Sequence, residues 1–211
     1  MGSSDHANRF HRFTSRGDVA AWESGIFRKW PYRHTMIDTV SATLSAHRSE
    51  GPLHVVEIAT GPGLMALCLL RDIPHLTYTG LDYSVPLSDF ARRRLSQFGP
   101  RAEVWHEDAN EDGWTRRLPA PVQAFVSLQA MHDLGNQDNV TRIYAKAFEL
   151  LDDDGIFVNA DFVTAPGKPN ANDPGRLPVA RHFEVLRDLG YAWTDCIARQ
   201  GDMACLVAGK R

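Results

Sequence analysis

The chain has 211 residues, of which 23 are Lys or Arg and 26 are Asp or Glu, so its formal charge is −3 at neutral pH. This length suits one domain with a sizeable core, whereas two full domains would be cramped. The slight negative charge gives no electrostatic reason to expect a nucleic acid or an anionic membrane as partner. The three cysteines lack metal or redox spacing, which indicates buried thiols in a reducing compartment.

The N-terminus shows no apolar signal core, and no apolar run reaches the roughly 18 residues that a membrane helix needs. We therefore expect a cytoplasmic protein. Residues 1–15 are polar and rich in His and Arg, so we expect them to lack fixed structure until something binds. A short helix is predicted at 18–30. A clearer one follows from Pro31, where apolar residues recur at helical spacing: Met36, Ile37, Val40 and Leu44.

From residue 54 onward, strand patterns alternate with helix patterns. Strands are predicted at 54–58, 76–82, 102–106, 122–128 and 156–163, then at 191–198 and 203–208 around a turn at Gly201-Asp202. Helices are predicted at 64–73, 85–98, 136–151 and before Gly190, and the acidic run 152–155 should end the third of these. A loop rich in Pro, Gly and Asn spans 164–177. This alternation predicts an α/β fold, with a doubly wound, mostly parallel sheet between helices.

The most informative stretch is 54–66, an apolar run that reaches Glu57 and then breaks into Gly61-Pro62-Gly63 before a helix. Glycines let the backbone approach a ligand, and the first turn of a helix offers free N–H groups and a partial positive charge. The stretch therefore predicts a nucleotide-type binding loop. It satisfies the dinucleotide pattern G-x-G-x-x-G/A, with Asp82 about twenty residues further on.

The unit from Glu57 to Gly63 also resembles the first motif of class I S-adenosylmethionine-dependent methyltransferases, an acid followed by three glycines at alternate positions. Ala59 stands here in place of the first glycine. Helices before the first strand and a terminal hairpin favour this family over a nicotinamide-binding domain. The resemblance implies three αβα layers with seven strands in the order 3-2-1-4-5-7-6. We expect residues 1–50 to form a flexible N-terminus and a helical cap or lid, and residues 51–211 to form the methyltransferase domain.

The implied cofactor is S-adenosylmethionine, with S-adenosylhomocysteine as its product. Asp82 would accept hydrogen bonds from the ribose hydroxyls, or it simply caps the next helix. Asp108 with Ala109 resembles the third-strand motif that contacts adenine, or it forms an acidic turn. Glu57 would orient the amino end, and burial would require it to have a cationic or hydrogen-bonding partner. The expected cofactor-binding residues are Glu57, Ala59, Thr60, Gly61, Gly63, Asp82, Tyr83, Asp108, Ala109 and Ser127.

His132 lies shortly beyond the fourth strand, where many small-molecule methyltransferases have a histidine. In plant-type and bacterial O-methyltransferases, a similar His-Asp pair includes the base that deprotonates a hydroxyl. His132 is therefore the candidate catalytic residue, although a histidine that merely packs beside the cofactor fits equally well. Asp133 would orient it or cap the following helix.

An aromatic and cationic group precedes the first strand. It is either core or a lid over an aromatic or apolar acceptor, with Tyr32 or Arg33 reaching the cofactor carboxylate. The residues assigned to substrate and lid are Trp30, Tyr32, Arg33, His132 and Asp133.

The sequence thus favours methyl transfer to a small molecule, most simply to oxygen. A repurposed or silent cofactor-binding protein is an alternative, and so is an NAD-dependent oxidoreductase, although Tyr144 and Lys146 do not have the Tyr-x-x-x-Lys spacing. Asp133 and Asp161 resemble part of a metal-dependent catechol methyltransferase site. The accompanying Asp-Asn set is missing, so no metal is expected. A small-molecule acceptor is the expected partner, without nucleic acid or membrane, and a homodimer is compatible with the sequence.

Overall fold

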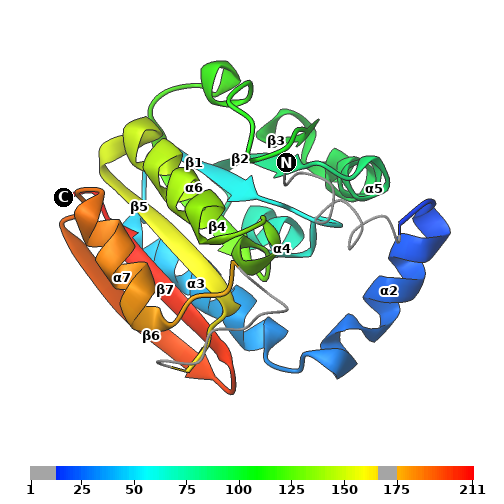
Figure 1. Cartoon of the computed structure of the whole chain (residues 1–211). Helices are drawn as coiled ribbons and strands as arrows, with labels where there is room; N and C mark the ends of the chain where they lie inside the picture. Colours follow the sequence, from blue (N-terminus) through cyan, green and yellow to red (C-terminus); the bar gives the residue numbers. More distant parts are fainter. Residues whose placement is uncertain (1–12, 166–174) are drawn as a thin grey trace.

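The computed structural model describes residues 13–165 and 175–211. Their seven strands form one sheet in the order β3-β2-β1-β4-β5-β7-β6, as expected (Figure 1). The pairs among the first five strands are parallel, and β7 runs antiparallel to both β5 and β6. The strands are β1 (Leu53–Ile58), β2 (Leu76–Asp82), β3 (Ala102–His106), β4 (Val122–Leu128), β5 (Leu151–Phe162), β6 (Trp193–Gln200) and β7 (Met203–Gly209).

The described helices are α2 (Arg16–Lys29), α3 (Arg33–His47), α4 (Leu64–Asp72), α5 (Val85–Leu95), α6 (Gln137–Leu150) and α7 (Val179–Asp188). Two of them begin with a capping box, in which side chain and backbone exchange hydrogen bonds across the first turn. Ser15 and Asp18 form it for α2, and Asn136 and Asn139 form it for α6. None of the helices in the described part of the chain is long and apolar enough to cross a bilayer.

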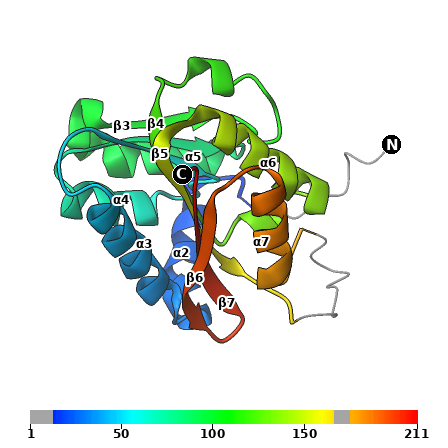
Figure 2. The ribbon, with the colours of Figure 1, turned by 90° about the vertical axis from the view of Figure 1, so that its left-hand side faces the viewer.

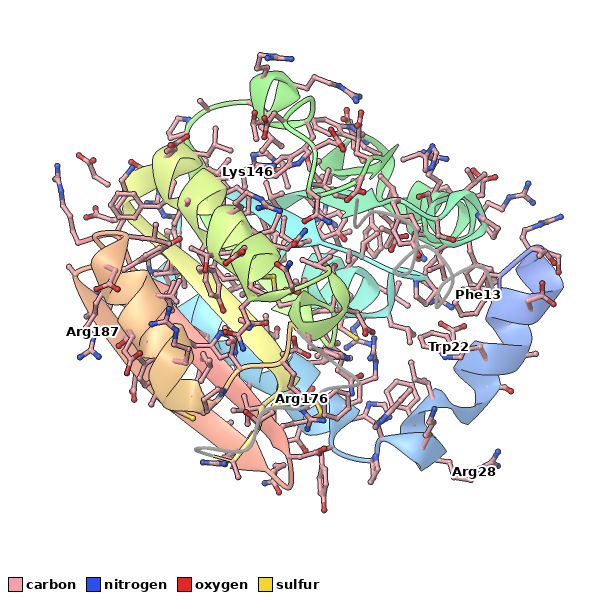
Figure 3. The ribbon with its side chains drawn as sticks, in the orientation of Figure 1. Phe13, Trp22, Arg28, Lys146, Arg176 and Arg187 are labelled. Carbon is pink, nitrogen blue, oxygen red and sulfur yellow. The ribbon has the colours of Figure 1, made fainter. Side chains whose placement is uncertain are left out.

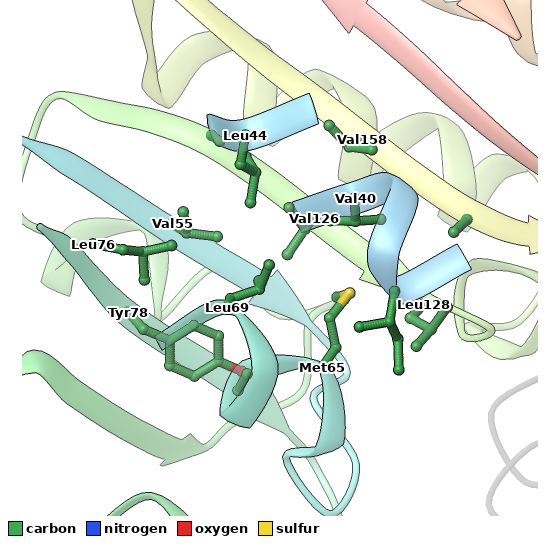
Figure 4. Close-up of a cluster of buried hydrophobic side chains, with 14 of the residues drawn as sticks. Val40, Leu44, Val55, Met65, Leu69, Leu76, Tyr78, Val126, Leu128 and Val158 are labelled. Atoms are coloured by element: carbon green, nitrogen blue, oxygen red, sulfur yellow. The ribbon is translucent and has the colours of Figure 1, made fainter. Parts of the chain in front are cut away.

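Helices cover both faces of the sheet, which gives the three expected layers. Figure 2 shows α3 and α4 on one side of the sheet and α6 and α7 on the other. On the first side, Val40 and Leu44 of α3 lie over Val126 and Val158 of the central strands, all fully or almost fully buried (Figure 4). Burying one such side chain contributes about 1.5–3 kcal/mol, so this packing fixes the sheet that carries the site.

Element boundaries differ from the prediction in two places. The acidic run Asp152–Asp154 lies inside β5, because α6 already ends at Leu150 and the strand starts directly after it. These carboxylates stay partly exposed, and Asp153 pairs with Arg211 at 2.6 Å. The helix predicted to 98 ends at Leu95 and continues as the 3-10 turn η1 (Ser96–Arg101), where Gly99 has a φ of 56°. Of the loop 164–177, residues 166–174 lie outside the described residues, as do 1–12 at the N-terminus.

Gly63 lets the start of α4 approach α5 closely. Its φ is +77°, and a Cβ at this position would lie 3.2 Å from the Cβ of Ala91. Gly51 has a similar φ of +80°, but a Cβ there would meet nothing within 4 Å. Gly51 is therefore a matched control for the effect of backbone conformation alone.

We expect Gly63→Ala to lower the free energy of unfolding by about 2–4 kcal/mol, through left-handed strain plus crowding against α5. Gly51→Ala should cost only about 1–2 kcal/mol, from the strain alone. Urea titrations of both variants measure the difference. If both variants lose the same free energy of unfolding, α5 moves aside and the close approach of residue 63 to Ala91 does not limit stability.

Candidate cofactor and acceptor site

The site lies at the carboxyl ends of β1 and β4, where the strand order reverses and open α/β sheets bind their ligands. In Figure 1, these strands point toward the side on which α2 lies. After β1 the backbone enters the left-handed region three times, at Ala59 (φ 55°), Gly61 (57°) and Gly63 (77°). Ala59 thus adopts the conformation that glycine would supply, at a cost of roughly 1–2 kcal/mol. The predicted loop shape is kept despite the substitution.

Asp82 fixes this loop from the end of β2. It is 4% exposed, and its two carboxylate oxygens accept the N–H groups of Gly61 at 2.8 Å and Ser84 at 2.9 Å. Burial raises the pKa of Asp82 to about 6, although these two hydrogen bonds oppose the shift. Ser84 occupies the N-cap of α5, but its side chain makes no capping bond. Asp82 therefore orients the glycine loop as well as the start of α5.

Glu57 is buried at the end of β1, and the partner that the sequence required is Tyr78. The Tyr78 hydroxyl donates to Glu57 Oε2 at 2.6 Å, and the Thr60 hydroxyl donates to the same oxygen at 3.3 Å. Burial raises the pKa of Glu57 to about 8, against the effect of these bonds. Gly80 leaves space for the phenol, since a Cβ there would lie 2.6 Å from the hydroxyl. The side chain of Thr60 thus faces this inner cluster and not the open edge.

Arg33 enters the same region from the start of α3 and is 7% exposed. One guanidinium nitrogen donates to Gln129 Oε1, while Nε is buried without a partner among the described atoms. Burial lowers the pKa of Arg33 to about 10, and the charges of Glu57 and Glu23 oppose that shift. Gln129 follows β4 with a φ of 53°, which is strained for a residue with a side chain. Sequence reasoning did not single out Gln129, because nothing local marks it.

Tyr32, the other candidate for the cofactor carboxylate, lies elsewhere. It is 42% exposed, and its ring packs against Gly201 in the turn between β6 and β7. Ser127 is fully buried, and its hydroxyl donates to the carbonyl of Ile58 at 3.4 Å, between β4 and β1. Of the two candidates for binding the cofactor carboxylate, the fold therefore brings Arg33 and not Tyr32 next to Glu57.

The turn after β3 carries the remaining cofactor candidates. One oxygen of Asp108, Oδ1, accepts the N–H of Asn110 at 2.9 Å, and Ala109 is 5% exposed. Tyr83 follows Asp82 at the end of β2 and is 37% exposed. The turns after β2 and β3 are adjacent, because their strands pair up to Asp82 and His106.

His132 lies in the 3-10 turn η3 (Met131–Asp133), between two carboxylates. Its Nδ1 is 2.6 Å from Asp161 Oδ1 and its Nε2 is 3.3 Å from Asp133 Oδ2. Asp161, from the end of β5, also accepts the backbone N–H of His132 at 2.8 Å. Burial favours the neutral ring, but Asp161 and Asp133 outweigh it and raise the pKa of His132 to about 10. In the sequence, Asp161 resembles only a possible metal ligand, and no local pattern indicates its contact with His132.

Metal-binding groups of three or more His, Cys, Asp or Glu side chains do not occur among residues 13–165 and 175–211. The expectation that no metal is needed stays a prediction.

His132 has an aromatic neighbour in Phe162, and Phe162 in turn contacts Trp30. The rings of His132 and Phe162 make a T-shaped contact with centroids 5.3 Å apart. The ring centroid of Trp30 lies 6.2 Å from that of Phe162. On the cap, Phe13 and Trp22 make an edge contact at 5.5 Å, and Figure 3 shows Trp22 on the side of α2 that faces the rest of the chain. Phe162 and Trp30 can form an apolar wall beside the histidine.

Residues 55–155 match a family model described as a methyltransferase domain. The chain has the Rossmann-like fold of a class I methyltransferase. None of the curated proteins searched matches the sequence.

Solved structures resemble the methyltransferase domain in fold. A putative O-methyltransferase from Nostoc punctiforme PCC 73102 has a TM-score of 0.70 at 13% identity, over 92% of this chain and 60% of that one. The 1,6-didemethyltoxoflavin-N1-methyltransferase of Burkholderia thailandensis has a TM-score of 0.68 at 19% identity, over 92% and 86%. The S-adenosylmethionine-dependent methyltransferase SibL has a TM-score of 0.67 at 17% identity, over 93% and 62%. The chain thus spans about three fifths of two of these proteins.

Within the methyltransferase domain, Arg94 of α5 joins α2 to the glycine loop. Its guanidinium donates to both carboxylate oxygens of Glu23, at 2.5 and 2.6 Å, and to the carbonyl oxygen of Pro62 at 2.8 Å. The side chains of Arg94 and Glu23 are only 16% and 17% exposed, so solvent screens this pair weakly. Figure 1 shows α2 apart from the sheet and beside α5, which agrees with this attachment.

We expect Glu23→Ala to release α2 from the domain. Trypsin should then cleave after Arg28 and Lys29, at the end of α2, about tenfold faster. The reason is that charge-assisted hydrogen bonds worth roughly 1.5 kcal/mol would be lost from a locally opening segment. Mass spectrometry of timed digests measures the rate.

Glu184→Ala is the control, because it removes an ion pair with Arg181 whose side chains are about half exposed. That variant should leave cleavage in α2 unchanged. If Glu23→Ala is cleaved no faster than wild type, Arg94 does not hold α2.

Proposed function

We propose that this domain transfers a methyl group from S-adenosylmethionine to an oxygen atom of a small molecule. The observation that carries the proposal is that two halves of a site meet at one edge of the sheet. The glycine loop with Asp82 and Asp108 forms the donor half, and the pair His132–Asp161 forms the acceptor half. In addition, the Burkholderia neighbour is described with S-adenosylhomocysteine bound.

The residues present fit this cofactor. Asp82 would accept from the ribose hydroxyls, and Asp108 would accept from the adenine amino group through Oδ2, since Oδ1 already accepts from Asn110. The buried Nε of Arg33, which has no partner among the described atoms, would donate to the carboxylate of the methionine tail. When bound, the cofactor supplies a methyl group on an electrophilic sulfonium.

The chain's own contribution to transfer is alignment and removal of a proton. Asp161 holds the imidazole of His132 by accepting from Nδ1, so Nε2 is the nitrogen that would take a hydroxyl proton. Asp133, 3.3 Å from Nε2, has to give way to the hydroxyl. Trp30 and Phe162 would exclude water and hold a planar, apolar acceptor beside this nitrogen. An unionised hydroxyl requires such a base, which is why we favour oxygen as the methylated atom.

If the donor half is assigned correctly, the protein binds S-adenosylhomocysteine in the micromolar range, and Asp82→Ala weakens binding at least tenfold. The variant loses the acceptor for the ribose and also the bond that orients the glycine loop. Gly61→Val should abolish binding, because the φ of 57° strains a β-branched residue. Isothermal titration calorimetry measures each affinity.

Asp195→Ala, on the edge strand β6, serves as the control and should bind like wild type. Unchanged binding in both site variants would refute the assignment. Binding without turnover on any phenolic or carboxylic acceptor would favour the repurposed protein, and fluorescence titration with NADH tests the oxidoreductase.

Turnover should rise with pH if His132 is the base. The pKa of His132 is raised to about 10, so the ring loses its proton only as the pH approaches that value. Between pH 7 and about 9, the rate of methyl transfer to an unionised hydroxyl should therefore increase roughly tenfold per unit. Asp161→Asn removes the main charge that raises the pKa, so its profile should level off at lower pH and at a lower maximum. Labelled methyl donor measures these rates with an acceptor found by screening.

His132→Ala should lower turnover at least a hundredfold while changing the affinity for S-adenosylhomocysteine less than threefold. Identical pH profiles for this variant and wild type would exclude His132 as the base.

A further inference from the structure

Lys146, on α6, holds the turn that follows β3. Its ammonium nitrogen lies 3.3 Å from the carbonyl oxygen of Ala109, 2.9 Å from that of Asn110 and 2.8 Å from that of Glu111. It also pairs with Asp112 Oδ1 at 2.9 Å. The Lys146 side chain is 13% exposed, and it passes over the ring of Trp114. Three consecutive carbonyls therefore converge on one cation.

This convergence determines where the N–H groups of the turn point. A peptide unit is planar and trans, so its N–H points away from its C=O. With the carbonyl of Ala109 turned toward Lys146, the N–H of the same peptide unit, which belongs to Asn110, points away from the lysine. That N–H donates to Asp108 Oδ1 at 2.9 Å. Lys146 thus orients the Asp108 carboxylate through one peptide unit, without touching it.

Two side-chain amides extend this support. Asn139 of α6 donates to Asn110 Oδ1 at 2.7 Å, and Asn110 in turn donates to the carbonyl oxygen of Leu134 at 3.0 Å. Leu134 directly follows η3, the turn that carries His132. Hydrogen bonds therefore attach the turn after β3 both to α6 and to the segment that carries His132.

We propose that Lys146 is a positioning residue that sets the selectivity of this site for adenine, by fixing the carboxylate that accepts from the purine amino group. The inference rests on the proposed function, because it needs an adenine nucleoside in the site. Lys146 is separated from Asp108 by 38 positions in the sequence, and only the packing of α6 beside the turn brings the two together.

The test compares two probes by calorimetry: S-adenosylhomocysteine and S-inosylhomocysteine, in which an oxo group replaces the purine amino group. An oxo group is an acceptor and would face the acceptor Asp108 Oδ2. Wild type should bind the adenosyl compound at least tenfold more tightly than the inosyl compound. K146M should lose most of this preference, so that the ratio of the two affinities falls below about threefold. The reason is that the Asp108 carboxylate is no longer oriented in this variant. K146M keeps the aliphatic stem over Trp114.

D112N is the matched control, because it weakens the exposed end of the Lys146 contact and leaves the three carbonyl contacts in place; it should keep the wild-type ratio. K146Q is measured alongside K146M, so that the comparison survives if the latter does not fold. In the D108N background, K146M should change the ratio no further, since Lys146 acts through Asp108.

A wild-type ratio retained in both K146M and K146Q overturns the inference and leaves the proposed function intact. Wild type that binds both probes equally well also overturns it, because Asp108 then does not read the amino group. Wild type that binds neither probe overturns the proposed function and the inference together.

Discussion

The buried carboxyl group of Glu57 is the constraint on which the rest of the site depends. An acid without a partner in the interior is costly, so β1 can end in Glu57 only if neighbouring elements supply donors and positive charge. Tyr78 of β2 supplies the hydroxyl, and Gly80 leaves the space for it. Arg33 of α3 supplies the charge and is itself held by Gln129 after β4. One buried group thus links three neighbouring strands to the cap.

The charges around this centre fit the chemistry that we propose. Asp82 lies on the donor side, whereas Asp133 and Asp161 flank a single protonated imidazole on the acceptor side. Carboxylates therefore outnumber the cation of His132 in this part of the site. A negative surplus of this kind among partly buried groups would attract a cationic sulfonium, since charges attract more strongly where the effective dielectric constant is low. Asp161 and Asp133 also raise the pKa of His132. The charges that would attract the donor therefore also move deprotonation of the imidazole to higher pH.

Two cations on the surrounding helices support the two ligand loops in the same way. Arg94 of α5 binds the carbonyl of Pro62 in the glycine loop, and Lys146 of α6 binds three carbonyls in the turn after β3. A carbonyl that is turned toward a helix leaves the N–H of its peptide unit pointing the other way. After β3 this N–H belongs to Asn110 and orients Asp108, and after β1 it belongs to Gly63 and donates to the carbonyl oxygen of Thr60 at 3.1 Å. The two helices therefore hold these loops in place from behind.

The alternation of strands and helices, the layers and the glycine loop followed from the sequence by itself, because hydrophobic periodicity and turn residues are local signals. The strand order was implied by the resemblance to class I methyltransferases and not by periodicity. The compartment, a homodimer, the absence of nucleic acid and the division at residue 50 remain predictions from composition and resemblance. Only the tertiary structure decided that Tyr78 pairs with Glu57, that Asp161 holds His132 and that Arg33 rather than Tyr32 lies beside Glu57. The members of each pair come from different elements of the fold. Which donor meets which acceptor depends on how those elements pack, and no local pattern encodes that.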